Sequence, residues 1–242
     1  MNLSDRVALV TGGAHRVGRA LVLALARAGA DLVLHYHAAE DEAAATAAEV
    51  EALGRRAVAL RADLSDPDQA TALGERAARA LGRLDVLVNS AALFESGSFL
   101  DVTAADWDRV MAVNARAPFL LLQATARHLA ASKGVAVNIA DVSGLRPWTG
   151  FPHHSISKAA LIHLTRLAAR SLAPDVRVNC IVPGTVLPPE DYTEEQRRES
   201  ARRTVLERTG SPQDVEDALM FLVRSEFATG SVVVVDGGRM LK

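Results

Sequence analysis

Seven short apolar runs alternate with helix-like segments along the chain, and this alternation restricts its possible fold more than any other feature. The runs read as continuous hydrophobic stretches, without the polar residue at every second position that a half-exposed strand shows. They are Val7–Thr11, Leu32–Tyr36, Ala57–Arg61, Val86–Asn89, Val135–Ala140, Val176–Val182 and Val232–Val235. Strands buried on both faces and separated by helices predict a doubly wound, Rossmann-like α/β fold, with a seven-stranded parallel sheet and helices on both faces.

Segments with helical periodicity fill the intervals between these runs. They predict helices at Arg16–Arg27, Ala39–Leu53, Pro67–Leu81, Ala104–Ala131, Ile156–Leu172 and Pro212–Arg224. No linker, internal repeat or low-complexity stretch interrupts the series. Residues 1–242 are therefore predicted to form a single domain.

One segment departs from the regular alternation. Residues 185–210 are long and charged, and Pro188 and Pro189 interrupt them near the start. A segment of this length between a strand and the last helix is typical of a substrate loop or lid. A solvated surface helix is the alternative interpretation.

The composition argues against two classes of partner. With a net charge of -2 and 23% charged residues, nothing favours binding to nucleic acid or to a membrane surface. The first residues are too polar for a signal peptide, and no apolar run approaches the roughly 18 residues of a membrane span. The single cysteine, Cys180, lies in an apolar run, which favours a buried structural thiol in a reducing compartment. The sequence thus predicts a cytoplasmic protein.

The first predicted strand leads into a glycine-rich turn and then a helix, in the order VALVTGGAHRVGRA. Gly12 and Gly13 allow a tight turn, and Gly18 allows the helix to pack close to the sheet. The N-terminus of such a helix offers free N–H groups and partial positive charge to a pyrophosphate. We therefore expect Gly12, Arg16 and Val17 to contact a dinucleotide cofactor. A tight turn without a ligand is the alternative.

The end of the second strand bears on the choice between NAD and NADP. An acid about 20 residues after the turn binds the ribose 2′-hydroxyl of NAD in such units. Here Tyr36 and His37 occupy that end, and there is no carboxylate. An arginine in the turn that faces the adenosine ribose, Arg16, would favour a 2′-phosphate, and His37 could be a second donor. The sequence therefore favours NADP(H) as the cofactor.

Further candidate cofactor residues follow the next two strands. Asp63 and Leu64 close the third strand, where an acid can accept a hydrogen bond from the adenine amino group. Asp63 is equally compatible with the N-cap region of the helix that begins near Pro67. Asn89 and Ala91 close the fourth strand, where small residues let the backbone approach the cofactor.

Four polar residues form a candidate catalytic group. Asp141 follows the fifth strand, at the end where loops of parallel sheets build sites. His154 and Lys158 are four residues apart, so a helix places them on one face. Asn114 lies in the middle of a predicted helix, where an amide is unfavourable unless it has a partner. The histidines near this helix do not share one face, so we expect no metal site.

Together these motifs resemble the short-chain dehydrogenase/reductase family, almost from end to end. They are T-G-x-x-x-x-x-G at Thr11–Gly18, Asn89–Ala91, Asn114, Asp141 to Lys158, Pro183–Gly184 and Asp236–Gly237–Gly238. The resemblance implies an active site at the carboxyl edge of the sheet and a homotetrameric assembly. It implies that Lys158 binds the nicotinamide ribose and that Asn114 holds a water molecule of the proton path. It also implies cofactor contacts by Pro183, Gly184 and Val186.

A narrower likeness is to pteridine reductases, which use NADPH to reduce dihydropterins or dihydrofolate-type rings. It depends on Arg16, where most of the family has glycine, on LHYH at 34–37, and on Asp141 in place of the usual serine. The resemblance implies a small-molecule substrate, either a pterin-like ring or another carbonyl or imine. In this group the acid orients the pterin or relays a proton.

One departure from the family pattern concerns catalysis directly. The tyrosine expected four residues before the lysine is replaced by His154. A Lys158 ammonium would favour the neutral imidazole, a base or a simple hydrogen-bond donor, whereas an Asp141 carboxylate would favour an imidazolium that can donate a proton. The remaining interpretation is a protein that binds NADP(H) with weak or no catalysis, in a binding or regulatory role.

Overall fold

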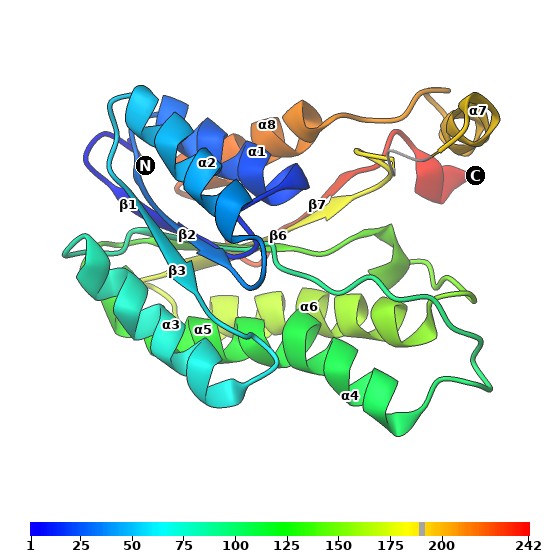
Figure 1. Ribbon diagram of the computed structural model, residues 1–242, viewed down its shortest axis with the longest axis horizontal. Helices are drawn as coiled ribbons and strands as arrows, with labels where there is room; N and C mark the ends of the chain where they lie inside the picture. Colours follow the sequence, from blue (N-terminus) through cyan, green and yellow to red (C-terminus); the bar gives the residue numbers. More distant parts are fainter. Residues whose placement is uncertain (189–191) are drawn as a thin grey trace.

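The strands form one parallel sheet of seven members, which confirms the predicted fold class (Figure 1). The computed structural model describes residues 1–188 and 192–242. The order in the sheet is β3-β2-β1-β4-β5-β6-β7, and each neighbouring pair is parallel. The strands are β1 (Val7–Val10), β2 (Asp31–Tyr36), β3 (Ala57–Arg61), β4 (Val86–Asn89), β5 (Val135–Ile139), β6 (Arg177–Pro183) and β7 (Val232–Val235).

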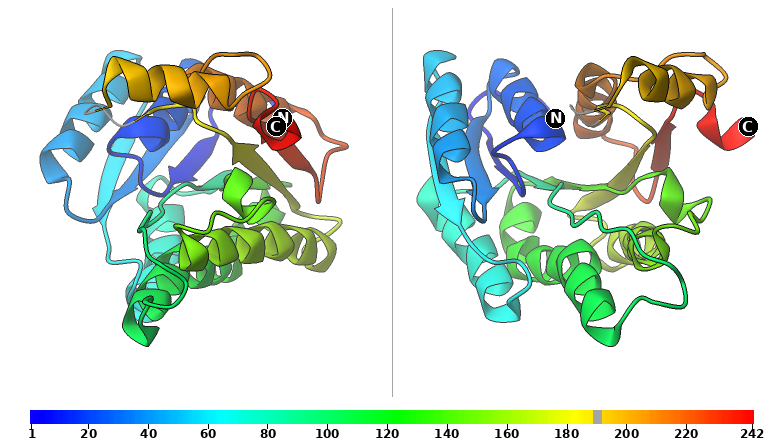
Figure 2. Two further views of the ribbon diagram at one scale, coloured as in Figure 1. Left: turned by 90° about the vertical axis from the view of Figure 1, so that its right-hand side faces the viewer. Right: turned by 45° about the vertical axis from the view of Figure 1, so that its right-hand side comes forward.

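Helices cover both faces of the sheet, as Figures 1 and 2 show. One layer consists of α1 (Arg16–Arg27), α2 (Glu40–Ala52) and α8 (Pro212–Arg224). The opposite layer consists of α3 (Pro67–Ala80), α4 (Ala104–Met111), α5 (Ala117–Ala131) and α6 (Pro152–Ser171). Along β1, Ala8 and Val10 pack into the first layer, while Val7 and Leu9 pack into the second. Because successive side chains point to opposite faces and both faces are covered, every residue of such a strand is apolar.

The centre of the sheet contains the point where the winding direction reverses. β1 lies between β2 and β4, and the chain leaves β1 toward α1 on one face but leaves β4 toward α4 on the other. The two connections therefore separate above the carboxyl ends of β1 and β4. In doubly wound sheets this crevice is the usual location of a ligand.

Two predicted helices differ from those in the structure. The predicted helix Ala104–Ala131 is wrong in its middle, where a π-helical turn, Ala112–Arg116, separates α4 from α5. The helix predicted to begin at Ile156 begins at Pro152 instead. Proline suits the first helical turn, because N–H groups there have no acceptor within the helix and proline has no N–H to leave unpaired. His154 therefore lies inside the first turn of α6.

The segment 185–210 contains a helix of its own, α7 (Glu194–Arg202). Thr193 and Gln196 form a capping box at its start, in which each side chain accepts from the other's backbone N–H. Most of its residues are exposed, as the surface-helix interpretation requires. Pro188 precedes it, and Pro189 lies outside the described residues.

Two expectations from composition can be compared with the structure. Cys180 lies in β6 and is fully buried, and this burial raises the pKa of its thiol to about 11, as a structural thiol requires. Within the described part of the chain, no helix combines the length and apolar character needed to cross a membrane.

The amino-terminal edge of the sheet is held by a buried carboxylate. Asp85, fully buried before β4, accepts hydrogen bonds from Arg6 at 2.8 Å, from the N–H of Val7 at 2.9 Å and from Arg83 at 2.7 and 2.8 Å. Burial alone would raise the pKa of Asp85, but these donors outweigh burial and lower it. The carboxylate thus links the starts of β1 and β4.

We expect Asp85→Ala to lower the free energy of unfolding by about 2 kcal/mol, because the buried N–H of Val7 loses its acceptor. Both arginines stay partly exposed and regain water, which limits the loss. Urea denaturation measures the change. Arg19→Ala removes an exposed pair with Glu49 and should cost under about 1 kcal/mol. Equal losses in the two variants would contradict this role of Asp85.

Candidate active site

Residues from several strand ends line one cavity of about 790 Å³ at the carboxyl edge of the sheet. It brings together five of the residues predicted from the sequence: Arg16, Val17, Asp141, Gly184 and Val186. Residues of the segment 185–210 line its other side, including Leu187, Tyr192 and Gln196. The segment therefore borders the candidate site, as the substrate-loop interpretation predicts, and is partly helical as well.

The glycine turn after β1 has the geometry of a phosphate-binding turn. A Cβ at Gly18 would lie 1.9 Å from the carbonyl oxygen of Gly12, so any side chain there would push the helix off the turn. Gly12 has φ of +65°, in the left-handed region. The N-terminus of α1 has no side-chain cap and no acid in its first turn, which leaves its N–H groups available to an anion. This donor set fits the pyrophosphate of a dinucleotide.

The turn depends on a histidine that the sequence reading missed. The N–H of Gly12 donates to Nδ1 of His35 at 3.1 Å, and Nε2 of the same ring lies 3.1 Å from the carbonyl oxygen of Ala62. These partners select the neutral tautomer with the proton on Nε2. Burial lowers the pKa of His35 to about 4, so the ring stays neutral at physiological pH. The sequence analysis assigned roles to Tyr36 and His37 of the motif LHYH. The first histidine of that motif, His35, is the residue that supports the turn.

The end of β2 carries no acid, as the sequence predicts. Tyr36 is partly buried and the side chain of His37 is exposed, 4.0 Å from the carboxylate of Asp63. Arg61 at the end of β3 donates from Nε to the carbonyl of His37 at 3.1 Å. Arg61 is therefore a cationic side chain at the end of β2, and the sequence analysis assigned it no role.

Asp63 does not cap the helix that follows it. Its carboxylate accepts from the N–H and hydroxyl of Ser65 at 2.8 and 2.7 Å, while Asp66 is the N-cap of α3. The N-cap alternative for Asp63 is therefore wrong. The neighbouring Leu64 is buried.

Arg16 reaches a different part of the site from the one expected. Its guanidinium donates to the carbonyl oxygen of Leu187 at 2.7 Å, in the segment after β6. It thus contacts the substrate-loop side of the cavity in this structure, whereas the sequence reading directed it toward the adenosine ribose.

Asn89 and Ala91 contribute through the sheet and the backbone. The side chain of Asn89 is buried and donates to Asn138 of β5 at 2.8 Å, so it links two strands and leaves the crevice to backbone groups. Asn138 in turn donates to Thr165 of α6 at 2.9 Å. The N–H of Ala91 donates to the hydroxyl of Thr11 at 3.1 Å, which joins the turns after β4 and β1.

Pro183 and Gly184 end β6 beside the terminal strand. The N–H of Gly184 donates to the carbonyl of Val235 at 2.8 Å. A Cβ at Gly184 would lie 2.8 Å from the Cα of Asp236. A side chain would separate these two segments at the edge of the cavity.

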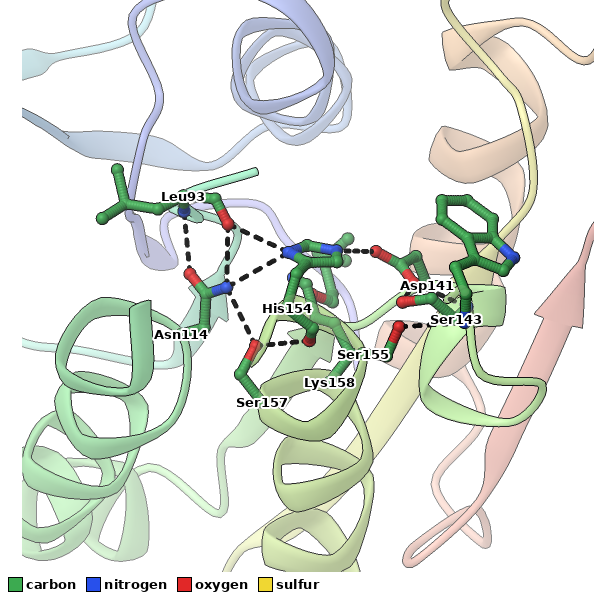
Figure 3. A network of polar contacts seen from close by, with 10 residues as sticks. Leu93, Asn114, Asp141, Ser143, His154, Ser155, Ser157 and Lys158 are labelled. Carbon is green, nitrogen blue, oxygen red and sulfur yellow. Dashed lines mark hydrogen bonds and ion pairs between the residues drawn. The ribbon is translucent and has the colours of Figure 1, made fainter. Parts of the chain in front are cut away.

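His154 is held between two oxygen atoms, as Figure 3 shows. Its Nε2 lies 2.6 Å from Oδ2 of Asp141, and its Nδ1 lies 3.0 Å from the carbonyl oxygen of Leu93. The amide nitrogen of Asn114 is farther from Nδ1, at 3.4 Å. Each ring nitrogen of His154 thus faces an oxygen atom that can accept a hydrogen bond from it.

The carboxylate of Asp141 is stabilised in its ionised form. It accepts from the N–H of Ser143 at 2.7 Å, from the hydroxyl of Ser143 and from His154. Burial would raise the pKa of Asp141, but the His154 hydrogen bond and the charge of Lys158 outweigh it and lower the pKa to about 2. An ionised carboxylate this close to an imidazole ring stabilises positive charge on that ring.

Lys158 lies below this pair and is almost completely buried. Its ammonium donates to the carbonyl of Ile139 at 3.0 Å. Burial lowers the pKa of Lys158, and the charge of Asp141 opposes that effect. The structure thus places Asp141, not Lys158, in direct contact with the His154 ring.

Asn114 has the partners that its position required. Its side-chain oxygen accepts from the N–H of Leu93 at 2.8 Å, and its amide nitrogen donates to the carbonyl of Leu93 at 2.9 Å and to Ser157 at 3.0 Å. The π-helical turn places the residue there. Pro118 has no N–H for the carbonyl of Asn114, so one α-helical hydrogen bond cannot form at this point.

Three aromatic side chains form a cluster that reaches the histidine through Phe94, and the sequence analysis assigned them no role. Phe94 meets the His154 ring edge-on, with centroids 4.8 Å apart, and stacks on Phe151 at 4.4 Å. Trp148 contacts Phe94 and Phe151 edge-on at 6.3 and 6.0 Å. They lie in loops whose positions only the folded chain defines. No group of three or more metal-binding side chains occurs in the described part of the molecule.

Comparisons with known proteins agree with this architecture. A protein-family model described as Enoyl-(Acyl carrier protein) reductase matches residues 12–239. The short-chain dehydrogenase/reductase FrzI of Cladobotryum sp is 34% identical, over 98% of this chain and 96% of that protein. L-rhamnose 1-dehydrogenase (NAD(P)(+)) of Sphingomonas sp. is 31% identical, over 98% and 96%.

Solved structures extend the likeness to three dimensions. A short chain dehydrogenase from Burkholderia cenocepacia J2315 in complex with NADP has a TM-score of 0.93 and 36% identity, covering 99% of this chain and 100% of that one. A blue fluorescent protein from a metagenomic library in complex with NADPH has a TM-score of 0.92 and 35% identity, covering 99% of both chains.

We expect Asp141→Asn to lower stability most at neutral pH. An aspartate with a pKa of about 2 in the folded state and about 4 when unfolded stabilises the fold above pH 4, by about 2 kcal/mol, and loses that contribution as the pH falls toward 2. Urea denaturation at pH 7 and pH 2.5 should therefore show a gap between wild type and variant that narrows in acid. Asp101→Asn, at an exposed position, is the control. A gap of constant size at both pH values would refute this interpretation.

Proposed function

The chain belongs to the short-chain dehydrogenase/reductase family of NAD(P)-dependent oxidoreductases, and from this we propose that it is an NADPH-dependent reductase of a small carbonyl or imine, with His154 as proton donor. The observation that supports this most is the position of the His154 ring between Asp141 and the Leu93 carbonyl. We propose that His154 stands where the family has its catalytic tyrosine.

The reaction needs one hydride and one proton. The reduced nicotinamide, when bound, supplies the hydride to the carbonyl or imine carbon. The protein would supply the proton to the substrate oxygen or nitrogen from Nε2 of His154, once this N–H exchanges the Asp141 carboxylate for the substrate atom. Before the transfer, Asp141 would stabilise the imidazolium. Asn114 and Lys158 hold the site through the carbonyl groups of Leu93 and Ile139. These contacts fix the loop after β4 and the end of β5.

We propose NADP(H) as the cofactor in preference to NAD. The end of β2 lacks a carboxylate, and His37 and Arg61 provide positive or donating groups there. Two of the similar solved structures contain NADP or NADPH. Arg16 supports the choice less directly, because it contacts Leu187.

A pterin-like ring is the substrate we propose first. Arg16, the LHYH motif and Asp141 carry the likeness to pteridine reductases. The stacked rings of Phe94 and Phe151 beside His154 offer an apolar surface to a planar substrate.

A second function, NADP(H) binding with weak or no catalysis, is favoured by one observation. Both nitrogens of His154 and the ammonium of Lys158 already have partners within the protein. A ring held at both ends has little freedom to donate to a substrate. Such a protein would bind or sense the cofactor.

We expect NADPH oxidation, followed at 340 nm, with dihydrobiopterin, dihydrofolate or a member of a carbonyl panel, and slower oxidation of NADH. His154→Phe should lower kcat about 100-fold or more, because it removes the proton donor. His163→Gln, on an exposed face of the same helix, is the control and should leave kcat unchanged.

His154→Tyr separates the two proposed functions. If the parent binds NADPH tightly without turnover and the tyrosine variant gains activity, the binding role is supported and the reductase proposal fails. If the tyrosine variant loses an activity that the parent has, the binding role fails.

We propose that the protein is a homotetramer, as the family resemblance implies. Large apolar side chains are exposed on α5, α6 and α8: Phe119, Ile156, Leu167 and Phe221. Light scattering after size exclusion should give about four times the chain mass of 25.7 kDa. A monomer mass at micromolar concentration would refute this assembly.

A further inference from the structure

Cationic side chains gather in a recess next to the candidate active site. The recess, of about 290 Å³, is lined by Arg146, Arg203, Arg239 and Lys242, together with Trp148 and Met240. Trp148, Arg203 and Arg239 also line the larger cavity that contains Asp141. The recess and the candidate active site are therefore adjoining spaces.

Arg239 is the most firmly positioned of these cations. Its guanidinium lies over the Trp148 ring, 4.9 Å from the ring centroid, and donates to the hydroxyl of Thr185 at 2.5 Å. The residue is half-buried, in a short 3₁₀ helix near the end of the chain. Burial, with the nearby positive charge of Arg203, lowers the pKa of Arg239. A planar fork held in this way is ready to bind an anion.

The positive charge of the recess exceeds its negative charge. Within residues 1–188 and 192–242, Arg203 pairs with Glu199, while Arg146, Arg239 and Lys242 form no ion pair. The carboxylate of Asp236 accepts instead from the N–H groups of Gly238 and Met240, each at 2.8 Å. Adjacent unpaired cations repel one another, and an anion between them would remove that repulsion.

The recess and the proton donor are at two ends of one surface. Trp148 contacts Arg239 on one side and Phe94 on the other, and Phe94 contacts the His154 ring. An apolar wall thus connects the cations to the site of proton transfer. A substrate that spans it needs an anionic group, an apolar or aromatic middle and a reducible end.

We propose that this recess binds an anionic oxygen group of the substrate, a carboxylate or a phosphate, through Arg239 with Arg203 and Arg146. The inference rests on the proposed function for the identity of the reducible end. The binding of the anion itself does not depend on turnover, so the two can be tested separately.

The first experiment compares 4-carboxybenzaldehyde with its methyl ester. Both have an aldehyde and an aromatic middle, and they differ in one negative charge at the far end. We expect wild-type kcat/KM to be at least about tenfold higher for the acid, since hydrogen bonds between charged groups are stronger than those between neutral groups. Arg239→Met should raise KM for the acid about tenfold and change KM for the ester much less. Arg146 lies at an exposed position and does not bond to Thr185. Arg146→Met should therefore also raise KM for the acid, while the Arg239–Thr185 hydrogen bond stays in place.

Arg208→Met is the matched control, because Arg208 is an exposed arginine near Asp214 that does not line either space. It should leave both substrates unaffected. Equal kcat/KM values for the acid and the ester in the wild type, or equal losses on both in Arg239→Met, would overturn the proposal.

The second experiment measures binding without catalysis. In Trp107→Phe, Trp148 is the remaining tryptophan, and its fluorescence reports the recess. Saturable changes with benzoate or inorganic phosphate, weakened about tenfold by Arg239→Met, support the proposal, and the tighter ligand identifies the anion. If this binding occurs but no substrate is reduced, only the reductase proposal fails. If neither anion gives a saturable change, the recess proposal is overturned.

Discussion

Burial of the sheet on both faces is the constraint from which the candidate site follows. A parallel strand covered by helices above and below has no wet face, so polar side chains collect where the strands end. Asp141, Asn89 and Gly184 all lie at such ends. The glycine turn after β1 and the reversal of winding between β1 and β4 add the space in which these groups meet.

The polar groups that do lie inside the layers act as links between elements. Asn89, Asn138 and Thr165 form a chain of hydrogen bonds from β4 through β5 to α6. This chain ties the helix that carries His154 and Lys158 to the centre of the sheet. The side-chain oxygen of Asn89 has no partner among the described residues, but the bonds of Asn138 form in one register of α6 only, so they favour that register over its neighbours.

The fold and part of the candidate site could be predicted from the sequence, because both follow from local patterns. The apolar runs predicted the strands, and the glycines predicted the tight turn after β1. Such local patterns do not predict the direction in which a long side chain points. Arg16 contacts Leu187, 171 positions away in the chain, and His35 supports a turn 23 positions earlier. The partners of the His154 ring, Asp141 and the Leu93 carbonyl, could not be predicted from any spacing in the sequence.

The π-helical turn at Ala112–Arg116 gives the helix an unusual dependence on chain length. A π turn is in effect an α-helix with one residue too many, so loss of a single residue there would restore a regular helix. Because a π turn takes up its extra residue locally, α4 and α5 would keep nearly their present phase, and α5 would keep its packing on α3. The residues of the turn itself would change direction, and Asn114 would lose the orientation in which its side chain bonds to Leu93. The site thus depends on the extra residue of this turn as well as on the identity of its side chains.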